Sequence, residues 1–591
     1  MGRAASVRRT TLDPSSPEAT TAPGNKPAVP KLALSLTLSS GAVFGASLAI
    51  QVLGVVASYF LYHHIGNVSN SGAALLGTVQ LFLLIGTSIN GIGDLRIGTA
   101  YTYYLARGKA PADNTTVYLL IRMGMVSAVG VVLFVVAPLS VDGYRLVMGD
   151  VQWTSLGIFL ALPLLWSFTA VYSNLFIGLN NSLKAQYPSL VEALARLPVL
   201  VFCAFYEPTI EGLTLAYVVG ACVSALYAAP TVLRYAYPFV RQEAAQLFRF
   251  AWPLMGSLLL NYMVTNMIPF LVSFRSGTAQ LNAFLLANGF RILVLSLPAA
   301  VTTPLFPYIA GLHRQEEYDG VRRGSWQALR YTSMLLVPGV VALVTYRSQF
   351  LNVLGGSHYV AVASWPLAIL VVGAIPLSLS QVMQSSINAI GRQRLELYIT
   401  STQVVVLFAS TFGLYAIVSN GDDLIAASVA VLLSSSAALA LNTYFLETLL
   451  KVRIQLRSVV SITVAAALAF GVISRFNKPG FLPVQTGYQL AGVIVLCFAV
   501  YFVVLALIGE LTKSDVRRIG RSLGFPARFC DAIAKLCWRD VDAELPPATP
   551  EEAPGLRQPE LPDTFTGTRE LPDIGEPLPP LDEDESARPP R

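Results

Sequence analysis

Charged residues are scarce in this chain, and their scarcity excludes a soluble fold. Only 13% of the 591 residues are Asp, Glu, Lys or Arg, whereas 54% are hydrophobic and the mean hydropathy is +0.59. Such values are typical of a polytopic membrane protein. The net charge of +6 is small, and the excess basic residues fall in alternate loops, which indicates membrane topology rather than a nucleic-acid partner.

Cysteine and histidine are also sparse, and no catalytic motif is present. The chain has four histidines, of which His63 and His64 are adjacent; we interpret this pair as loop residues rather than metal ligands. There is no phosphate-binding glycine loop and no nucleophile elbow. Gly91 and Gly93 lie in an apolar segment, where close helix packing explains them. We therefore predict no enzyme activity, no cofactor and no metal site. The five cysteines have neither metal-ligand spacing nor a disulfide pattern: Cys203, Cys222, Cys497, Cys530 and Cys537.

Apolar windows long enough to cross a bilayer follow one another with little between them. A transmembrane helix takes roughly 20 apolar residues, and about fourteen such windows are present. Basic residues gather in alternate connections, for example at Arg107 and Lys109 and again at Arg453 and Arg457. The positive-inside rule then places both termini in the cytoplasm. We predict an all-α, multi-pass protein of the cytoplasmic (inner) membrane. The windows are about 38–61, 73–95, 117–138, 153–178, 187–206, 212–233, 251–273, 281–310, 329–346, 363–388, 396–418, 424–447, 458–475 and 488–509.

Both ends of the chain differ from the apolar body. Residues 1–31 are rich in Ser, Thr and Pro, which predicts a disordered cytoplasmic tail. Residues 512–541 can form an amphipathic juxtamembrane helix on the anionic inner leaflet, although a plain cytoplasmic helix fits equally well. Residues 542–591 are acidic and proline-rich, which predicts a second disordered cytoplasmic tail.

An internal repeat divides the apolar body into two halves. The fourth and tenth windows each end in small residues and a short basic turn, after which a tyrosine opens the next helix. These tyrosines, Tyr187 and Tyr398, lie 211 positions apart. We predict two parallel six-helix bundles at 32–240 and 241–450, followed by two additional transmembrane helices at 451–511. Parallel halves of this kind are typical of alternating-access transporters.

One arginine lies in the middle of an apolar window. Arg291 is about ten residues from the start of the eighth window, with Asn288 one turn earlier on the same face. A charge at this depth costs at least ~2.5 kcal/mol and usually serves function. The alternative is a hydrogen-bonded arginine that ties helices together. Three prolines later in the window are expected to bend the helix: Pro298, Pro304 and Pro307.

Other polar residues within the windows divide into candidates for a cavity and residues with structural roles. Glu192 and Arg196 are four apart on one helix, and we predict a structural ion pair. Arg122 lies about one turn inside its window, where it is expected to snorkel. Asp94 and Arg96 do not share a helix face and need separate partners. The predicted substrate-binding cavity residues are Arg291, Asn288, Arg96, Asn90, Asn261, Gln381 and Gln384.

An unpaired arginine between two helical halves suits an anion, phosphate above all, because its guanidinium forms a bidentate fork. The windows contain few acidic residues, which argues against a carrier of cationic drugs. No ATP-binding motif is present, so energy would come from an ion gradient or from consumption of the product outside.

Four segments resemble the polysaccharide-transporter branch of the multidrug/oligosaccharidyl-lipid/polysaccharide (MOP) flippase superfamily, which contains O-antigen and exopolysaccharide repeat-unit flippases. The segments are LFRFAWPLMGSLL, ANGFRILVLSLPAAVTTPLFPYIAGL, GLNNSLKAQYPSL and AIGRQRLELY. The resemblance runs from about residue 35 to residue 510 and implies a MATE-like, V-shaped pair of bundles. It also implies movement of a polyprenyl-diphosphate-linked oligosaccharide to the outer leaflet, with Arg291 placed where a cavity-lining arginine often occurs. Membrane lipids and polysaccharide polymerase or export proteins are the implied partners.

The sequence departs from related families in two ways, and three alternatives stay open. Lipid II flippases are similar but carry arginines in their first span, whereas residues 38–61 have none. The acidic tail at 542–591 is also outside the family pattern. The alternatives are a lipid II-type peptidoglycan-precursor flippase, a multidrug or cation antiporter on the same fold, and a scaffold whose tail recruits glycan enzymes.

Overall fold

The structure is a computed structural model, and most of the apolar body is described in it. The described residues are 45–46, 49–66, 70–106, 111–136, 140–141, 144–145, 153–179, 181–206, 208–235, 241–314, 317–392, 394–418, 422–452, 456–475, 487–511, 513 and 516. The tails predicted at 1–31 and 542–591 lie outside this set, as does nearly all of the amphipathic segment predicted at 512–541.

The first six predicted windows form a group of helices. An apolar helix, Ala49–Ile65, ends in a π-helical turn, η1 (Tyr62–Gly66). The helices that follow are α2 (Asn70–Ile92), α3 (Ile97–Ala106), α4 (Pro111–Val136), α5 (Trp153–Gly178), α6 (Ser182–Ala185), α7 (Tyr187–Tyr206) and α8 (Ile210–Arg234). Two short strands, β1 (Ser140–Val141) and β2 (Tyr144–Arg145), pair antiparallel between α4 and α5, a small exception to the predicted all-α fold.

The later windows form a second group. It contains α9 (Arg241–Arg314), α10 (Tyr318–Thr345), α11 (Arg347–Gly355), α12 (Ser357–Ala389), α13 (Arg394–Ile417) and α14 (Asp423–Leu450), followed by α15 (Leu456–Arg475) and α16 (Gly487–Ile508). Tyr187 opens α7 and Tyr398 lies in the first turns of α13. The two tyrosines that define the predicted repeat therefore occupy similar positions in the two groups.

The helices confirm an α-helical membrane fold. Among the described residues, eleven helices are long and apolar enough to cross a membrane, and two shorter apolar helices lie at Ala49–Ile65 and Ser458–Ser474. One of the eleven, Met255–Ser296, joins the windows predicted at 251–273 and 281–310. The segments follow the predicted windows in order, while the number fourteen stays a prediction.

A single glycine divides the long helix α9. Gly277 has φ 84° and ψ 175°, a backbone conformation that is essentially restricted to glycine. The break separates a first half, 241–276, from a second half, 278–314. The helix continues through Pro298 and Pro307, and the non-helical dihedral angles within α9 are those of Gly277. The bends expected at the prolines stay a prediction.

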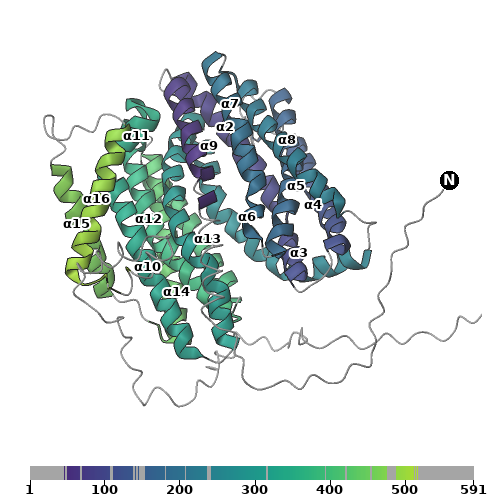
Figure 1. The fold of residues 1–591 in the computed structure, drawn as a ribbon. Helices are drawn as coiled ribbons and strands as arrows, with labels where there is room; N and C mark the ends of the chain where they lie inside the picture. Colours follow the sequence, from purple (N-terminus) through teal and green to yellow (C-terminus); the bar gives the residue numbers. More distant parts are fainter. Residues whose placement is uncertain are drawn as a thin grey trace, which may run out of the picture. The chain divides into compact units, whose positions relative to one another are not determined.

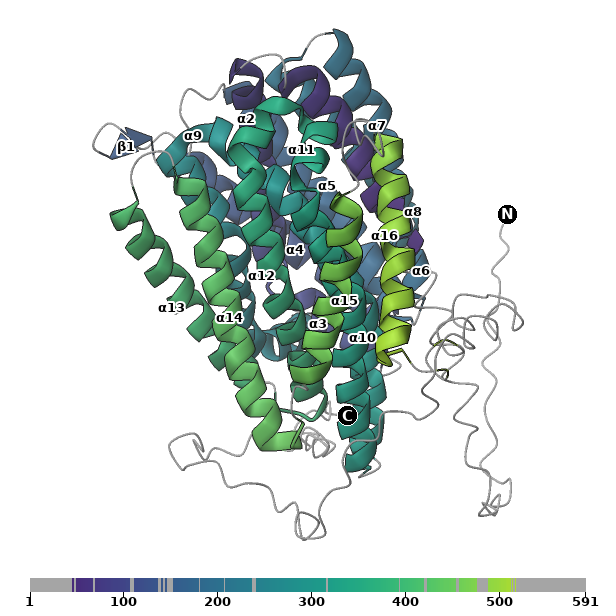
Figure 2. The same ribbon diagram turned by 90° about the vertical axis from the view of Figure 1, so that its left-hand side faces the viewer.

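Packing groups the helices into two bundles. In the first bundle α5 contacts α2, α3, α4 and α8, and in the second α12 contacts α9, α10, α11 and α14. The blue and purple helices of the first bundle and the green helices of the second lie on either side of α9 (Figure 1). The pair α15 and α16 packs on α10 (Figure 2). At this contact the Tyr501 hydroxyl donates to the Met334 carbonyl at 2.9 Å.

A seam between α2 and α9 joins the bundles, and glycines permit the close approach. A β-carbon added at Gly77 would lie 1.9 Å from the Thr278 carbonyl oxygen, and one added at Gly91 would lie 1.7 Å from the Tyr262 hydroxyl. The Tyr262 hydroxyl donates to the Thr87 carbonyl at 2.8 Å. The prediction that Gly91 serves close helix packing is therefore confirmed.

Candidate functional site

A cavity of about 420 Å³ lies beside this seam. Its walls come from the first apolar helix, from α2 and from the second half of α9, so both bundles contribute to it. No lining residue is charged, and most of the wall is apolar. The polar side chains in the wall are Gln51, Ser58, Tyr62, Gln80 and Thr87.

Two amide oxygens in this wall lack hydrogen-bond donors. The Oε1 atoms of Gln51 and Gln80 are buried and have no hydrogen-bond partner within the described part of the chain. The other end of the Gln80 amide donates from Nε2 to the Tyr62 hydroxyl. Because a buried polar atom without a partner is costly, these oxygens favour a bound group that donates hydrogen bonds.

Arg291, the residue on which the sequence prediction centres, lies on a different face of α9. Gly289 and Leu293 line the cavity, and Arg291 is two residues from each, which corresponds to about 200° around a helix. Its Nη1 donates to Asn288 Oδ1 at 3.0 Å. Its Nε is buried without a hydrogen-bond partner, and no carboxylate pairs with it among the described residues.

Arg96 also has no carboxylate partner among the described residues. It lies in the turn between α2 and α3, where Leu95 and Arg96 have φ values of 45° and 59°. Its Nε is buried without a hydrogen-bond partner. The left-handed turn thus holds a guanidinium with an unused donor at the end of α2.

The other predicted cavity residues do not gather at one place. Asn90 is engaged, since its Oδ1 accepts from Arg122 Nη2 at 2.7 Å. Asn261 and Gln381 are exposed on α9 and α12, and Gln384 is half-buried on α12. None of the predicted residues lines the cavity described above. The sequence analysis did not place Gln51, Gln80 or Tyr62 in a cavity.

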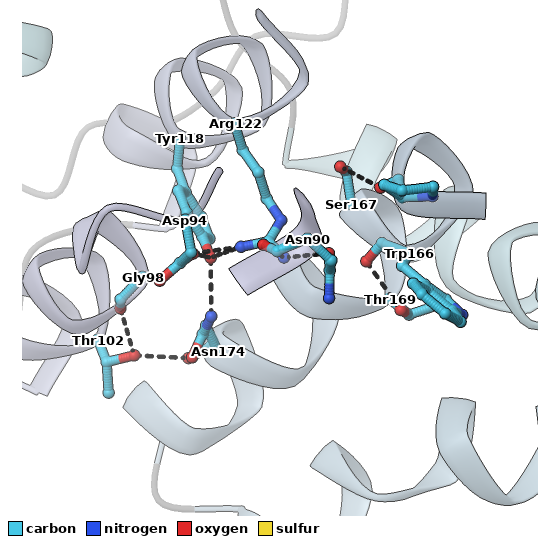
Figure 3. A network of polar contacts seen from close by, with 11 residues as sticks. Asn90, Asp94, Gly98, Thr102, Tyr118, Arg122, Trp166, Ser167, Thr169 and Asn174 are labelled. Atoms are coloured by element: carbon cyan, nitrogen blue, oxygen red, sulfur yellow. Dashed lines mark hydrogen bonds and ion pairs between the residues drawn. The ribbon is translucent and has the colours of Figure 1, made fainter. Parts of the chain in front are cut away.

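A buried network inside the first bundle corrects one prediction (Figure 3). Arg122 is only 3% exposed and forms an ion pair with Asp94, so the expectation that it snorkels is wrong. The Tyr118 hydroxyl donates to Asp94 Oδ1 at 2.7 Å and accepts from Asn174 Nδ2 at 2.8 Å. The network joins α2, α4 and α5 directly beside the left-handed turn.

Local packing explains why the network closes at this point. A β-carbon at Gly98 would lie 2.6 Å from both Asn174 Nδ2 and the Tyr118 hydroxyl, so only glycine leaves room. Near Gly93, an added β-carbon would lie 2.5 Å from a Val126 methyl group, which places α2 against α4. The sequence did contain one indication of this network, because Asp94 and Arg122 are oppositely charged and lie in neighbouring windows.

The remaining acidic side chains of the interior are also engaged. Glu192 and Arg196 lie 3.7 Å apart, and the Trp166 indole donates to the same carboxylate at 3.2 Å. Arg275 Nε donates to Asp423 Oδ1 at 2.8 Å. Within the described chain, no group of three His, Cys, Asp or Glu side chains is placed to hold a metal ion. The interior therefore offers neutral amides, hydroxyls and two arginines, with no carboxylate in the cavity wall.

Part of the chain matches a known protein family. Residues 72–313 match the family model described as "Polysaccharide biosynthesis protein". The probable multidrug resistance protein NorM of Agrobacterium fabrum (strain C58 / ATCC 33970) is 28% identical over 209 residues, which are 32% of this chain and 42% of that protein. The chain thus spans less than half of the length of this curated relative.

Two solved structures show the same fold. The lipid II flippase MurJ in an inward closed conformation has a TM-score of 0.63 at 12% identity, covering 79% of this chain and 98% of that one. A multidrug resistance MATE family transporter of the MOP superfamily, in an outward-facing conformation, has a TM-score of 0.51 at 14% identity, covering 71% and 98%. The chain is thus similar to a polysaccharide biosynthesis family over residues 72–313, and it shares its fold with a lipid II flippase and with a transporter of the MOP superfamily.

Proposed function

We propose that this membrane protein is a flippase of the MOP superfamily that translocates a polyprenyl-diphosphate-linked oligosaccharide, a repeat unit of a surface polysaccharide or exopolysaccharide, by alternating access. The observation that carries the proposal is the uncharged cavity between the two bundles, whose mostly apolar wall contains amide and hydroxyl groups. The match to a polysaccharide biosynthesis family model over residues 72–313 supports the same substrate class.

The cavity wall suits a sugar. Sugar hydroxyls both donate and accept hydrogen bonds, and the unpartnered oxygens of Gln51 and Gln80 need donors. Tyr62 and Phe290 add aromatic surface to the same wall, against which the apolar face of a sugar ring can pack. The volume of about 420 Å³ lies within the range of ~300–1,000 Å³ that is usual for small-ligand sites.

The two arginines without carboxylate partners supply a place for the diphosphate. Arg291 and Arg96 each keep a buried Nε without a hydrogen-bond partner in the described structure. A guanidinium binds phosphate oxygens through two parallel hydrogen bonds. In this proposal Arg96 meets the diphosphate near the cytoplasmic end of α2. Arg291 faces away from the cavity in this structure, so it holds the diphosphate at mid-membrane only after α9 has turned during the transport cycle.

A cation antiporter fits the interior less well. A buried carboxylate that faces the cavity would attract a cation, and none lies in the cavity wall. Asp94 and Asp423 are instead paired with arginines, so their charges are already compensated.

A lipid II-type flippase is the second candidate, because the MurJ structure shares the fold over 79% of this chain. Two features oppose it. The described part of the first helix, Ala49–Ile65, carries no arginine or lysine, and the family-model match is to polysaccharide biosynthesis.

The function is tested by deleting the gene, extracting lipids and staining surface glycan. We expect diphosphate-linked glycan lipid to accumulate while the surface polymer disappears. Complementation with Arg291→Ala, inserted at the wild-type level, should fail to restore the polymer, because the diphosphate loses its cation. Arg249→Ala is the matched control, since this arginine lies on the same helix and is exposed.

Three outcomes would contradict the proposal, and each points elsewhere. Wild-type surface glycan in the Arg291→Ala strain removes that arginine from the mechanism. Accumulated peptidoglycan precursor with cell lysis indicates the lipid II-type function. Sensitivity to toxic cations with intact surface glycan indicates the antiporter.

A further inference from the structure

A chain of four side chains closes one end of the cavity. Gln80 on α2 donates from Nε2 to the hydroxyl of Tyr62 in η1. The edge of one ring meets the face of the other between Tyr62 and Tyr359 of α12, with centroids 5.3 Å apart and planes at 86°. Asn282, in the second half of α9, donates from Nδ2 to the Tyr359 hydroxyl at 2.7 Å. The chain therefore runs from the first bundle to the second.

These side chains are packed as a seal. Tyr62 is 3% exposed, Tyr359 is 1% exposed and Asn282 is fully buried. Beside them Gly77 meets the Thr278 carbonyl without room for a β-carbon, so the two bundles touch along backbone as well as side chains.

The seal shares two residues with the cavity. Gln80 and Tyr62 both line the cavity, and Tyr62 also makes the contact that reaches the second bundle. Tyr62 lies just before the connection that leads to Asn70, and Asn282 lies just after Gly277. The distribution of basic residues predicts that both of these connections lie on the outside of the membrane. The seal therefore separates the cavity from the outer face.

The forces that hold the seal are suited to reversible opening. The single contact among these residues that crosses between the bundles is the edge-to-face pair of Tyr62 and Tyr359. A neutral amide–phenol hydrogen bond supports each ring within its own bundle, and no ion pair is among the four residues. Such contacts are individually weak. The unpartnered oxygens Gln80 Oε1 and Asn282 Oδ1 offer hydrogen-bond acceptors that water can reach when the contact opens.

We propose that Tyr62, Tyr359 and Asn282 form the outer gate of the cavity, and that Gln80 is the positioning residue that holds the Tyr62 ring in its closed place. The gate proposal rests on the proposed function only for the identity of the substrate that passes the gate. Opening and closing of the gate can be measured without any transported substrate.

The test is labelling of a cavity cysteine from outside. The five native cysteines are replaced, and Ser58→Cys is introduced, because Ser58 lines the cavity and its hydroxyl bonds only to the Gly54 carbonyl of its own helix. Intact cells are treated with a membrane-impermeant maleimide. Tyr62→Phe removes the hydroxyl that accepts from Gln80 and should speed labelling about two- to tenfold, the change in equilibrium expected for one hydrogen bond.

A double-variant comparison isolates the role of Gln80. Gln80→Leu should speed labelling as much as Tyr62→Phe, and the two together should add nothing further, because both remove the same bond. Tyr59→Phe is the matched control, since Tyr59 lies one turn earlier on the same helix, is exposed and stacks on His63. It should leave the labelling rate unchanged.

The gate proposal is overturned by unchanged labelling in both Tyr62→Phe and Tyr359→Phe at wild-type expression and monodispersity. Additive effects of Gln80→Leu and Tyr62→Phe would overturn the positioning role. If the gate variants are labelled faster but deletion of the gene leaves surface glycan intact, the gate is retained and the proposed function is wrong. The two failures are therefore distinguishable.

Discussion

Replacing Arg122 by methionine should strongly destabilise the first bundle. Methionine has a similar length and fills the space without strain, but it removes the charge that compensates Asp94 and the hydrogen bond of 2.7 Å to Asn90 Oδ1. Removing one partner of a buried ion pair costs about 3–5 kcal/mol. Because the Asp94 side chain is 22% exposed, we expect the lower end, about 3 kcal/mol.

The loss is measured as the midpoint of thermal aggregation in detergent, followed by fluorescence-detected size exclusion. A domain of the size of this bundle shifts by about 2–4 °C per kcal/mol, so the midpoint should fall by about 6–12 °C. The double variant Arg122→Met with Asp94→Asn should recover most of the loss, because no buried charge is then left unpaired. Arg323→Met, an exposed arginine on α10, should change stability by less than ~0.5 kcal/mol.

Two results would refute this reasoning. A midpoint for Arg122→Met equal to that of the wild type would mean that Asp94 is well solvated without its partner. A double variant no more stable than the single variant would mean that the destabilisation comes from packing rather than from the uncompensated carboxylate.

Two further predictions concern the seam between α2 and α9 and the break in α9 at Gly277. Gly77→Ala places a methyl group on the Thr278 carbonyl, so it should separate α2 from α9 and reduce surface glycan in complemented cells. The control Gly124→Ala, with nothing within 4 Å, should keep wild-type glycan and gain up to ~1 kcal/mol of stability. Equal glycan levels in the two variants would contradict the close contact at the seam. Gly277→Ala should cost about 1–3 kcal/mol because only glycine tolerates that backbone conformation, and a thermal midpoint unchanged from that of the wild type would show that α9 can straighten there at no cost.

The position of the membrane segments could be predicted because hydropathy over some twenty residues is a local property of the chain. The window at 396–418, for example, is the helix Arg394–Ile417, and the window at 488–509 is Gly487–Ile508. The join within α9 could not be seen in this way. Three prolines drew attention to the second half of the helix, while the break lies at Gly277.

The candidate site was predicted less completely. Arg291 and Asn288 are hydrogen-bonded as their spacing suggested, but the cavity lies on the other face of the same helix. Glutamines such as Gln51 and Gln80 carry no charge, so nothing in the sequence distinguished them from amides that face lipid headgroups. Arg122 could be taken for an interfacial residue because its partner, Asp94, lies on another helix.

The sequence by itself therefore determined that the chain is a helical membrane protein and where its spans lie, and it predicted two similar halves that follow one another. Only the tertiary structure decided which polar groups meet. The physical reason is that a helix that is apolar on all sides has no hydrophobic stripe to show which face turns inward. Its rotation and depth are fixed by close packing between distant residues, as where Gly77 meets Thr278, and those contacts place Gln80, Tyr62 and Tyr359 at one end of the cavity.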